Sequence, residues 1–204
     1  MYWTLTLFFA SSLNACVVAV EQESSKANDY LTEKWGKWFD CDDFNHDGIL
    51  SMEDPKIFEE RYRALENLSD KQLKTIIDKM NRLWNAFFFT NKTEMSKDDF
   101  INMMKQRFES NTTAFNEMVR AFLSEWCEVI DINGDTFLSE EEFLLNFAAE
   151  KHTNIPQNKQ LFYMMKPLNG RVPNVDIITY YLRFATEPDM AKQDIIVDAI
   201  NSGV

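Results

Sequence analysis

The stretch from Asp43 to Asp54 constrains the fold of this chain more than any other segment. Oxygen donors alternate along it, and Gly48 stands in the sixth place, where the backbone must turn sharply. The candidate ligands are Asp43, Asn45, Asp47, the backbone carbonyl of Ile49, Ser51 and Asp54. A hard divalent cation takes oxygen ligands, and a tight loop of about twelve residues delivers them from one short segment. The pattern therefore predicts a cation-binding loop between two helices rather than an acidic surface turn.

A second stretch, from Asp131 to Glu142, repeats this order of donors. The candidate ligands are Asp131, Asn133, Asp135, the backbone carbonyl of Phe137, Ser139 and Glu142. Its departure is Thr136 in the sixth place, where a β-branched residue at positive φ costs about 1–3 kcal/mol. The first loop departs at Asp54, whose side chain is shorter than the usual glutamate. We expect both loops to bind calcium (Ca2+), with a weakened first site at which magnesium (Mg2+) competes better.

Two further segments fit the same template but lack its donors. Residues 88–99 place Phe88, Thr90 and Lys92 at the first, third and fifth positions, and residues 165–176 begin with Met165. The four segments recur every 35 to 45 residues or so, and apolar side chains at helical spacing flank each one. This repeat predicts an all-α fold of four EF-hand helix-loop-helix units, of which the second and fourth have lost their ion.

The units are expected to pair, because the eighth residues of two such loops can form a short antiparallel β contact. Residues 27–107 would form the first pair and residues 111–184 the second, followed by a C-terminal tail over residues 185–204. Each pair then combines one binding loop with one structural loop. We expect the two lobes to form one compact domain.

The N-terminal residues have the composition of a leader. Residues 1–20 contain no charged side chain and are mostly apolar at first, which predicts a secretory signal peptide over residues 1–19. A membrane anchor and a lipoprotein processing site are the alternatives, and a cytoplasmic location follows if the segment is not a signal. Sequons at Asn67, Asn91 and Asn111 suit a secreted glycoprotein. No membrane span is expected in the mature chain.

Composition narrows the function. A net charge of −12 disfavours nucleic acid and anionic membranes as partners and suits a cation binder. The chain has only two histidines and no nucleophile–base grouping or glycine-rich phosphate loop, so we expect no enzyme activity. Cys41 and Cys127 are expected to be free thiols, although a bridge between them stays open. A monomer is expected, and the sequence identifies no protein partner.

A resemblance adds to this interpretation. The run Phe-Asn-His-Asp-Gly-Ile-Leu-Ser over residues 44–51, the closing Asp54 and the segment Ala-Thr-Glu-Pro-Asp over residues 185–189 resemble the sarcoplasmic calcium-binding protein and calexcitin group. The similarity covers about Tyr30 to Ile200. It implies a compact helical fold whose tail packs back on the lobes, and buffering of calcium and magnesium. Members of that group are usually cytosolic and commonly keep three working sites, whereas two complete loops are present here.

Three functions fit these observations. The first is a calcium and magnesium buffer or carrier. The second is a calcium sensor that exposes an apolar groove to a partner, for which the ten methionines would suit an adaptable surface. The third is a small-molecule carrier, since luciferin-binding EF-hand proteins share this architecture and the aromatic residues could line a cavity. Binding of an apolar dye that increases with calcium would favour the sensor.

Overall fold

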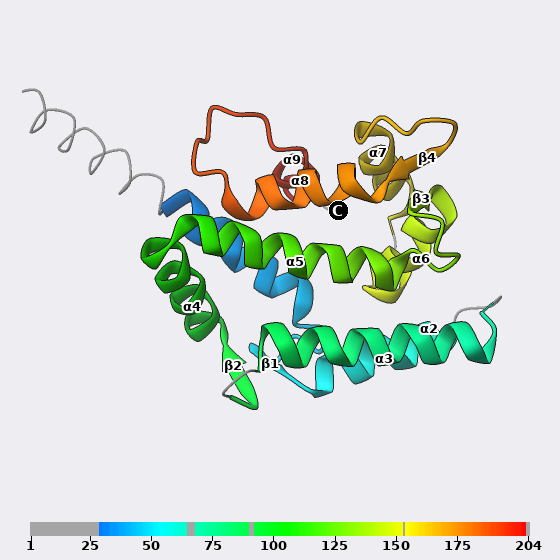
Figure 1. Ribbon diagram of the computed structural model, residues 1–204, viewed down its shortest axis with the longest axis horizontal. Coiled ribbons are helices and arrows are strands. Elements are labelled where there is room, and N and C mark those ends of the chain that lie inside the picture. Colours follow the sequence, from blue (N-terminus) through cyan, green and yellow to red (C-terminus); the bar gives the residue numbers. More distant parts are fainter. Residues whose placement is uncertain (1–28, 65–67, 90–91, 153, 203–204) are drawn as a thin grey trace, which may run out of the picture.

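The computed structural model describes residues 29–64, 68–89, 92–152 and 154–202. The expected leader over residues 1–19 and the sequon residues Asn67 and Asn91 lie outside this part. The described chain is mostly helical, with two small strand pairs (Figure 1). It opens with a helix over residues 29–42. The elements that follow are β1 (Ile49–Ser51), α2 (Glu53–Ala64), α3 (Asp70–Phe87), β2 (Glu94–Ser96), α4 (Lys97–Ser110), α5 (Thr112–Ile130), β3 (Phe137–Ser139), α6 (Glu140–Ala149), α7 (Ile155–Met164), β4 (Arg171–Pro173), α8 (Asn174–Thr186) and α9 (Ile195–Asn201).

Polar caps fix where the helices begin. Ser69 starts α3 with a capping box, in which its hydroxyl accepts the N–H of Gln72 and the Gln72 side chain accepts the N–H of Ser69. Asn111 starts α5 by accepting the N–H of Ala114 at 3.0 Å. Both starts agree with the sequence. Helix α7 begins at Ile155, and Pro156 follows in its first turn, where the missing N–H of proline is tolerated.

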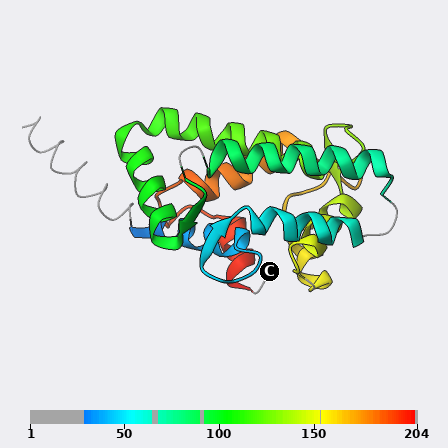
Figure 2. The same ribbon diagram turned by 90° about the horizontal axis from the view of Figure 1, so that it is seen from below.

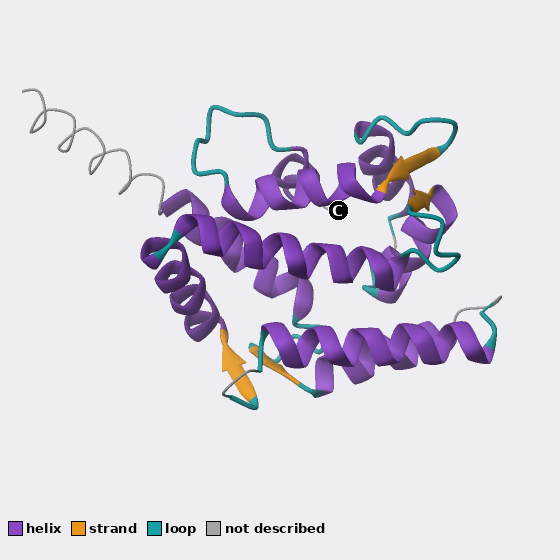
Figure 3. Ribbon diagram, in the orientation of Figure 1, coloured by secondary structure: helices purple, strands orange, loops and turns teal. Residues whose placement is uncertain are grey.

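The loops pair through their eighth residues, as predicted. Leu50 of β1 lies opposite Met95 of β2, and Leu138 of β3 lies opposite Val172 of β4, both in antiparallel register. All four side chains are buried. Figure 3 shows the two strand pairs well apart in the molecule. Each donor-bearing loop is therefore tied by backbone hydrogen bonds to a loop that lacks donors.

One continuous core joins the two lobes, and α5 runs through it. Helix α5 contacts α8, α3 and α4, and Figure 2 shows α3 running alongside it. Trp38 illustrates the packing, because its ring lies 5.4 Å from Phe122 of α5 and 5.8 Å from Phe87 of α3. Such aromatic contacts add to the free energy of burial. Among the methionines, Met80, Met95, Met104 and Met165 are buried in this core rather than displayed on the surface.

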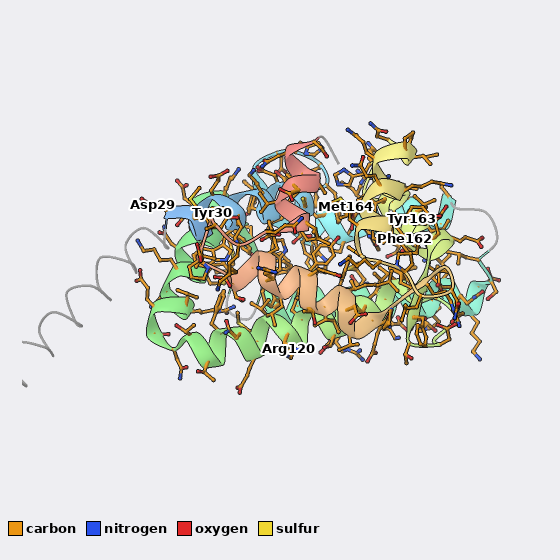
Figure 4. The ribbon with its side chains drawn as sticks, turned by 90° about the horizontal axis from the view of Figure 1, so that it is seen from above. Asp29, Tyr30, Arg120, Phe162, Tyr163 and Met164 are labelled. Carbon is orange, nitrogen blue, oxygen red and sulfur yellow. The ribbon has the colours of Figure 1, made fainter. Side chains whose placement is uncertain are left out.

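The C-terminal tail folds back on the lobes. Helix α9 packs against α7 and α8. Lys34 anchors the tail from the first helix, since its buried ammonium forms an ion pair with Asp194 at 3.3 Å and donates to the carbonyl of Glu187 at 2.8 Å. The same ammonium lies 4.5 Å from the centre of the Tyr30 ring. Figure 4 places Tyr30 well away from Tyr163 of α7, with side chains filling the space between the helices.

Two further expectations concern cysteine and membranes. Cys41 and Cys127 are both free thiols, so the bridge that the sequence left open is not formed. Within the described residues, no helix combines the length and the apolar run that a membrane crossing needs.

Candidate metal centres

The first loop buries two carboxylates whose hydrogen bonds, among the described residues, come from backbone N–H groups. Asp43 is 5% exposed and Asp54 is fully buried. Asp43 accepts the N–H of Gly48 at 2.9 Å, and Asp54 accepts the N–H groups of Phe44 and Ser51 at 3.0 and 2.9 Å. Burial raises the pKa of Asp54, and its backbone hydrogen bonds oppose that shift. Asp54 therefore reaches across the loop to its beginning despite its short side chain.

The remaining candidate side-chain ligands of the first loop lie closer to solvent. The amide of Asn45 donates to Oδ2 of Asp47 at 2.8 Å, and Oδ1 of Asp47 accepts the N–H of Ile49 at 2.8 Å. Ser51 accepts the N–H of Glu53 at 3.1 Å. Gly48 has φ +82°, a conformation that glycine adopts without steric cost.

The second donor-bearing loop is built in the same way. Asp131 and Glu142 are 7% and 6% exposed. Asp131 accepts the N–H groups of Gly134 and Thr136 at 2.8 and 2.9 Å. The carboxylate of Glu142 accepts the N–H of Asn133 at 3.2 Å with one oxygen and the N–H of Ser139 at 3.0 Å with the other. The two halves of the loop thus each donate a backbone hydrogen bond to Glu142.

Thr136 adopts the strained conformation that the sequence predicted, with φ +68°. Its neighbours hold it there, because its N–H donates to Asp131 and its carbonyl accepts the N–H of Asn174 at 3.0 Å. The side chain of Asn174 also donates to Oδ2 of Asp131, at 2.9 Å. The fourth unit therefore supports the first ligand of the third.

Arg171 is the residue that the sequence analysis missed. It belongs to β4, in the loop without donors, and its Nη1 lies 2.7 Å from Oδ2 of Asp135. Its guanidinium also lies 4.8 Å from the centre of the Phe137 ring. The pairing of the loops could have identified Arg171 from the sequence, because the register that sets Leu138 opposite Val172 also sets Ser139 opposite Arg171. Arg171 of the fourth loop, which lacks ligands, therefore contacts Asp135, a candidate ligand of the third loop.

In the second unit, a lysine side chain pairs with the closing carboxylate of the loop. Lys92 forms an ion pair with Asp99 at 3.0 Å, joining the fifth and twelfth positions of that loop. The hydrogen bond from Lys92 is the main cause that lowers the pKa of Asp99. This arrangement agrees with the expected loss of ion binding, since the closing carboxylate is already paired.

The donor chemistry of the two complete loops suits a hard divalent cation. All candidate ligands are oxygens, and within the described ranges none of the four buried candidate carboxylates, Asp43, Asp54, Asp131 and Glu142, pairs with lysine or arginine. No three His, Cys, Asp or Glu side chains converge in this part of the chain. Each donor set instead mixes carboxylates with an amide, a hydroxyl and a backbone carbonyl, and the carboxylates here accept backbone N–H groups.

Comparison with known proteins decides the family. The sequence is 30% identical over 177 residues to the sarcoplasmic calcium-binding protein of Mizuhopecten yessoensis, covering 85% of this chain and 99% of that protein. The chain belongs to the sarcoplasmic calcium-binding protein family. No family model matches the sequence. The family resemblance and the all-α EF-hand fold that the sequence indicated are thereby confirmed.

Solved structures support the fold. The coelenterazine-binding protein of Renilla muelleri, in its calcium-loaded apo form, matches with a TM-score of 0.72 at 15% identity, covering 83% of this chain and 94% of that one. The magnesium-loaded apo form of the ctenophore photoprotein berovin matches with a TM-score of 0.53 at 17% identity, covering 75% and 87%. Both likenesses support the fold, and it is the compared proteins that were solved in calcium-loaded and magnesium-loaded states.

Proposed function

We propose that the protein is a calcium buffer that binds two ions, one in the loop 43–54 and one in the loop 131–142. The observation that carries this proposal is the burial of Asp43, Asp54, Asp131 and Glu142 without a lysine or arginine partner in the described structure. Burying a carboxylate without a counter-charge costs several kcal/mol or so. A divalent cation held by each loop offsets that cost, so binding and folding stabilise one another.

The two sites are proposed to differ. In the first loop, Asp54 closes the ring with a shorter side chain, which favours a six-coordinate ion and strengthens competition by magnesium. In the second loop, Glu142 presents two oxygens, but Thr136 is strained and Arg171 contacts Asp135. The second site should therefore select calcium more strongly, at an affinity below that of an unhindered loop.

Buffering is favoured over sensing by the way the core is closed. A sensor opens its helix pairs to expose an apolar groove. Here the aromatic core is shared between the lobes, and the ion pair of Lys34 with Asp194 ties the tail over it. Only one loop of each pair has a ligand set to drive opening. Dye binding that is unchanged by calcium would support the buffer, whereas a several-fold gain would support the sensor.

Native mass spectrometry tests the number of ions directly. The proposal expects two calcium ions on the wild-type chain and one on Glu142→Ala. Glu117→Ala is the control, because this exposed glutamate on α5 lies outside both loops, and it should keep two ions. A wild-type chain that takes up one ion or none would contradict the proposal.

A secretory location is proposed on the sequence of residues 1–19 alone. Of the three sequons, Asn111 is the one within the described residues, where it is exposed at the start of α5. Expression of the full chain in a secreting cell should release protein whose mass falls after glycosidase treatment. Retention of the chain in the cytosol would overturn the proposal and leave the buffer cytoplasmic.

A further inference from the structure

A cavity of about 110 Å³ lies between the two lobes and under the tail. The helix over residues 29–42 and helices α5, α6, α7, α8 and α9 all contribute to its wall. Most of that wall is apolar, and its aromatic part consists of Trp38, Phe122, Trp126, Phe147, Tyr181 and Phe184. An apolar protein cavity of about 150 Å³ is known to accept a single benzene ring. The space here is smaller than that, so it limits a ligand to a single small ring.

Two carboxyl groups interrupt this apolar wall. Asp42 and Glu150 both line the cavity, and Oδ2 of Asp42 is buried without a hydrogen-bond partner. Glu150 accepts one hydrogen bond, from the side-chain amide of Asn146 at 2.8 Å. The two acids act on each other, because the charge of Glu150 adds to burial in raising the pKa of Asp42. These two half-buried acids have no lysine or arginine ion-pair partner among the described residues.

The basic groups nearby do not supply one. Among the described residues that line the cavity, none is a lysine or an arginine. The charge of Arg61 reaches Glu150, but its guanidinium donates to the carbonyls of Phe44 and Ala149, each at 2.9 Å, and forms no ion pair within the described chain. Burial lowers the pKa of His152, the remaining basic residue of the wall, which favours its neutral form.

The geometry points to a ligand that combines a ring with a positive charge. We propose that this cavity binds a small aromatic amine in its protonated form, with the ammonium group against Asp42 and Glu150 and the ring among the aromatic side chains. An ammonium donates up to three hydrogen bonds, so it satisfies both carboxyl groups at once. Trp38, Trp126 and Tyr181 add attraction between the cation and their rings. This site shares no residue with the candidate calcium ligands, although Asp42 directly precedes Asp43, and it goes beyond the proposed buffering.

The tail contributes to the wall of the cavity. Ile196, Ala199 and Ile200 of α9 form part of the wall. The buried ion pair between Lys34 and Asp194 sits at the start of that helix. The protein's own C-terminal helix therefore forms one side of the site.

Calorimetry on the calcium-saturated full chain tests the proposal with 2-phenylethylamine as the probe. 2-Phenylethanol is the neutral analogue of similar size, and 3-phenylpropanoate is the anionic one. We expect the amine to bind about tenfold more tightly than the alcohol, since hydrogen bonds to charged groups are the stronger ones, and the anion to give no binding heat. Equal affinity of amine and alcohol would overturn the proposal, as would no binding at all, which would mean that water alone fills the space.

Two variants locate the binding. Glu150→Gln should weaken the amine about tenfold and leave the alcohol unchanged, whereas Glu117→Gln on the exposed face of α5 should change neither. Ala199→Phe should fill the cavity and abolish binding of both. A calcium titration with two binding events shows that each variant is folded. Amine binding that survives both Glu150→Gln and Ala199→Phe would contradict the assignment.

Discussion

Arg171 donates a hydrogen bond to Oδ2 of Asp135 at 2.7 Å, and this contact joins the fourth loop to the third. Asp135 occupies the fifth position of its loop, where an oxygen ligand is expected. The guanidinium therefore stands where it competes with a bound cation for the same carboxylate. Both side chains are partly exposed, so the ion pair itself is worth about 1 kcal/mol or less. The larger effect of Arg171 is on a calcium ion in the loop 131–142, because its positive charge is held beside that site.

Removing this guanidinium should strengthen the second site. Arg171→Gln frees Asp135 and takes away a positive charge, so we expect calcium to bind the loop 131–142 roughly two- to tenfold more tightly, in proportion to about 1 kcal/mol. Calorimetric titration measures this affinity. Lys166→Gln serves as the control, because it also removes one positive charge from the loop 165–176, at an exposed position. An equal gain in both variants would show that net charge, and not the contact with Asp135, sets the affinity.

The strain at Thr136 is open to a separate test. Thr136→Gly removes the β-branched side chain at φ +68°, so the free energy of unfolding should rise by about 1 kcal/mol even without calcium. Urea denaturation in the presence of a chelator measures it. Thr93→Gly, at an exposed position without positive φ, should instead lower the stability, because glycine only loosens the unfolded chain there. A loss of stability in both variants would contradict the strain.

Glu150 should make the stability depend on pH. Burial raises its pKa from the ordinary value of 4.5 to about 7 in the folded state. Between these two values the folded protein holds a proton that the unfolded chain has released, so raising the pH through this window lowers the free energy of unfolding. Glu150→Gln should be more stable than wild type at pH 8, and the difference should shrink toward pH 4.5. A difference that is constant with pH would contradict the raised pKa.

The ion pair that anchors the tail should respond strongly to the loss of one partner. Lys34→Met leaves Asp194 buried without its cation and should lower the free energy of unfolding by about 3–5 kcal/mol. The double variant Lys34→Met with Asp194→Asn should recover most of that loss, because the asparagine oxygen can still accept from the N–H groups of Ile196 and Val197. Urea denaturation compares the two. A double variant no more stable than Lys34→Met would argue against a buried charge as the cause.

Much of the fold was predictable because it follows from local patterns. The period of the loops, the caps at Ser69 and Asn111 and the pairing of Leu50 with Met95 each depend on residues close in sequence or on a fixed loop position. The candidate ligands were identifiable for the same reason, since one short segment supplies each set. Their ion binding stays a prediction until it is measured.

The remaining features depend on contacts between distant segments. Lys34 and Asp194 are 160 positions apart, and no local pattern connects them. The contact of Arg171 with Asp135 follows only once the register of β3 and β4 is known. Likewise the cavity arises where six helices meet, so Asp42 and Glu150 look like ordinary acidic residues in the sequence. Tertiary packing gives these residues their roles.

A calcium titration by calorimetry, with and without magnesium, tests the central claim most directly. We expect two binding events in the wild-type chain, of which Asp43→Ala removes one and Glu142→Ala removes the other. Magnesium should weaken the event that depends on Asp43 more than the event that depends on Glu142, because Asp54 closes the first loop. Absence of binding heat, or loss of the same event in both variants, would contradict the assignment of two calcium sites to these loops.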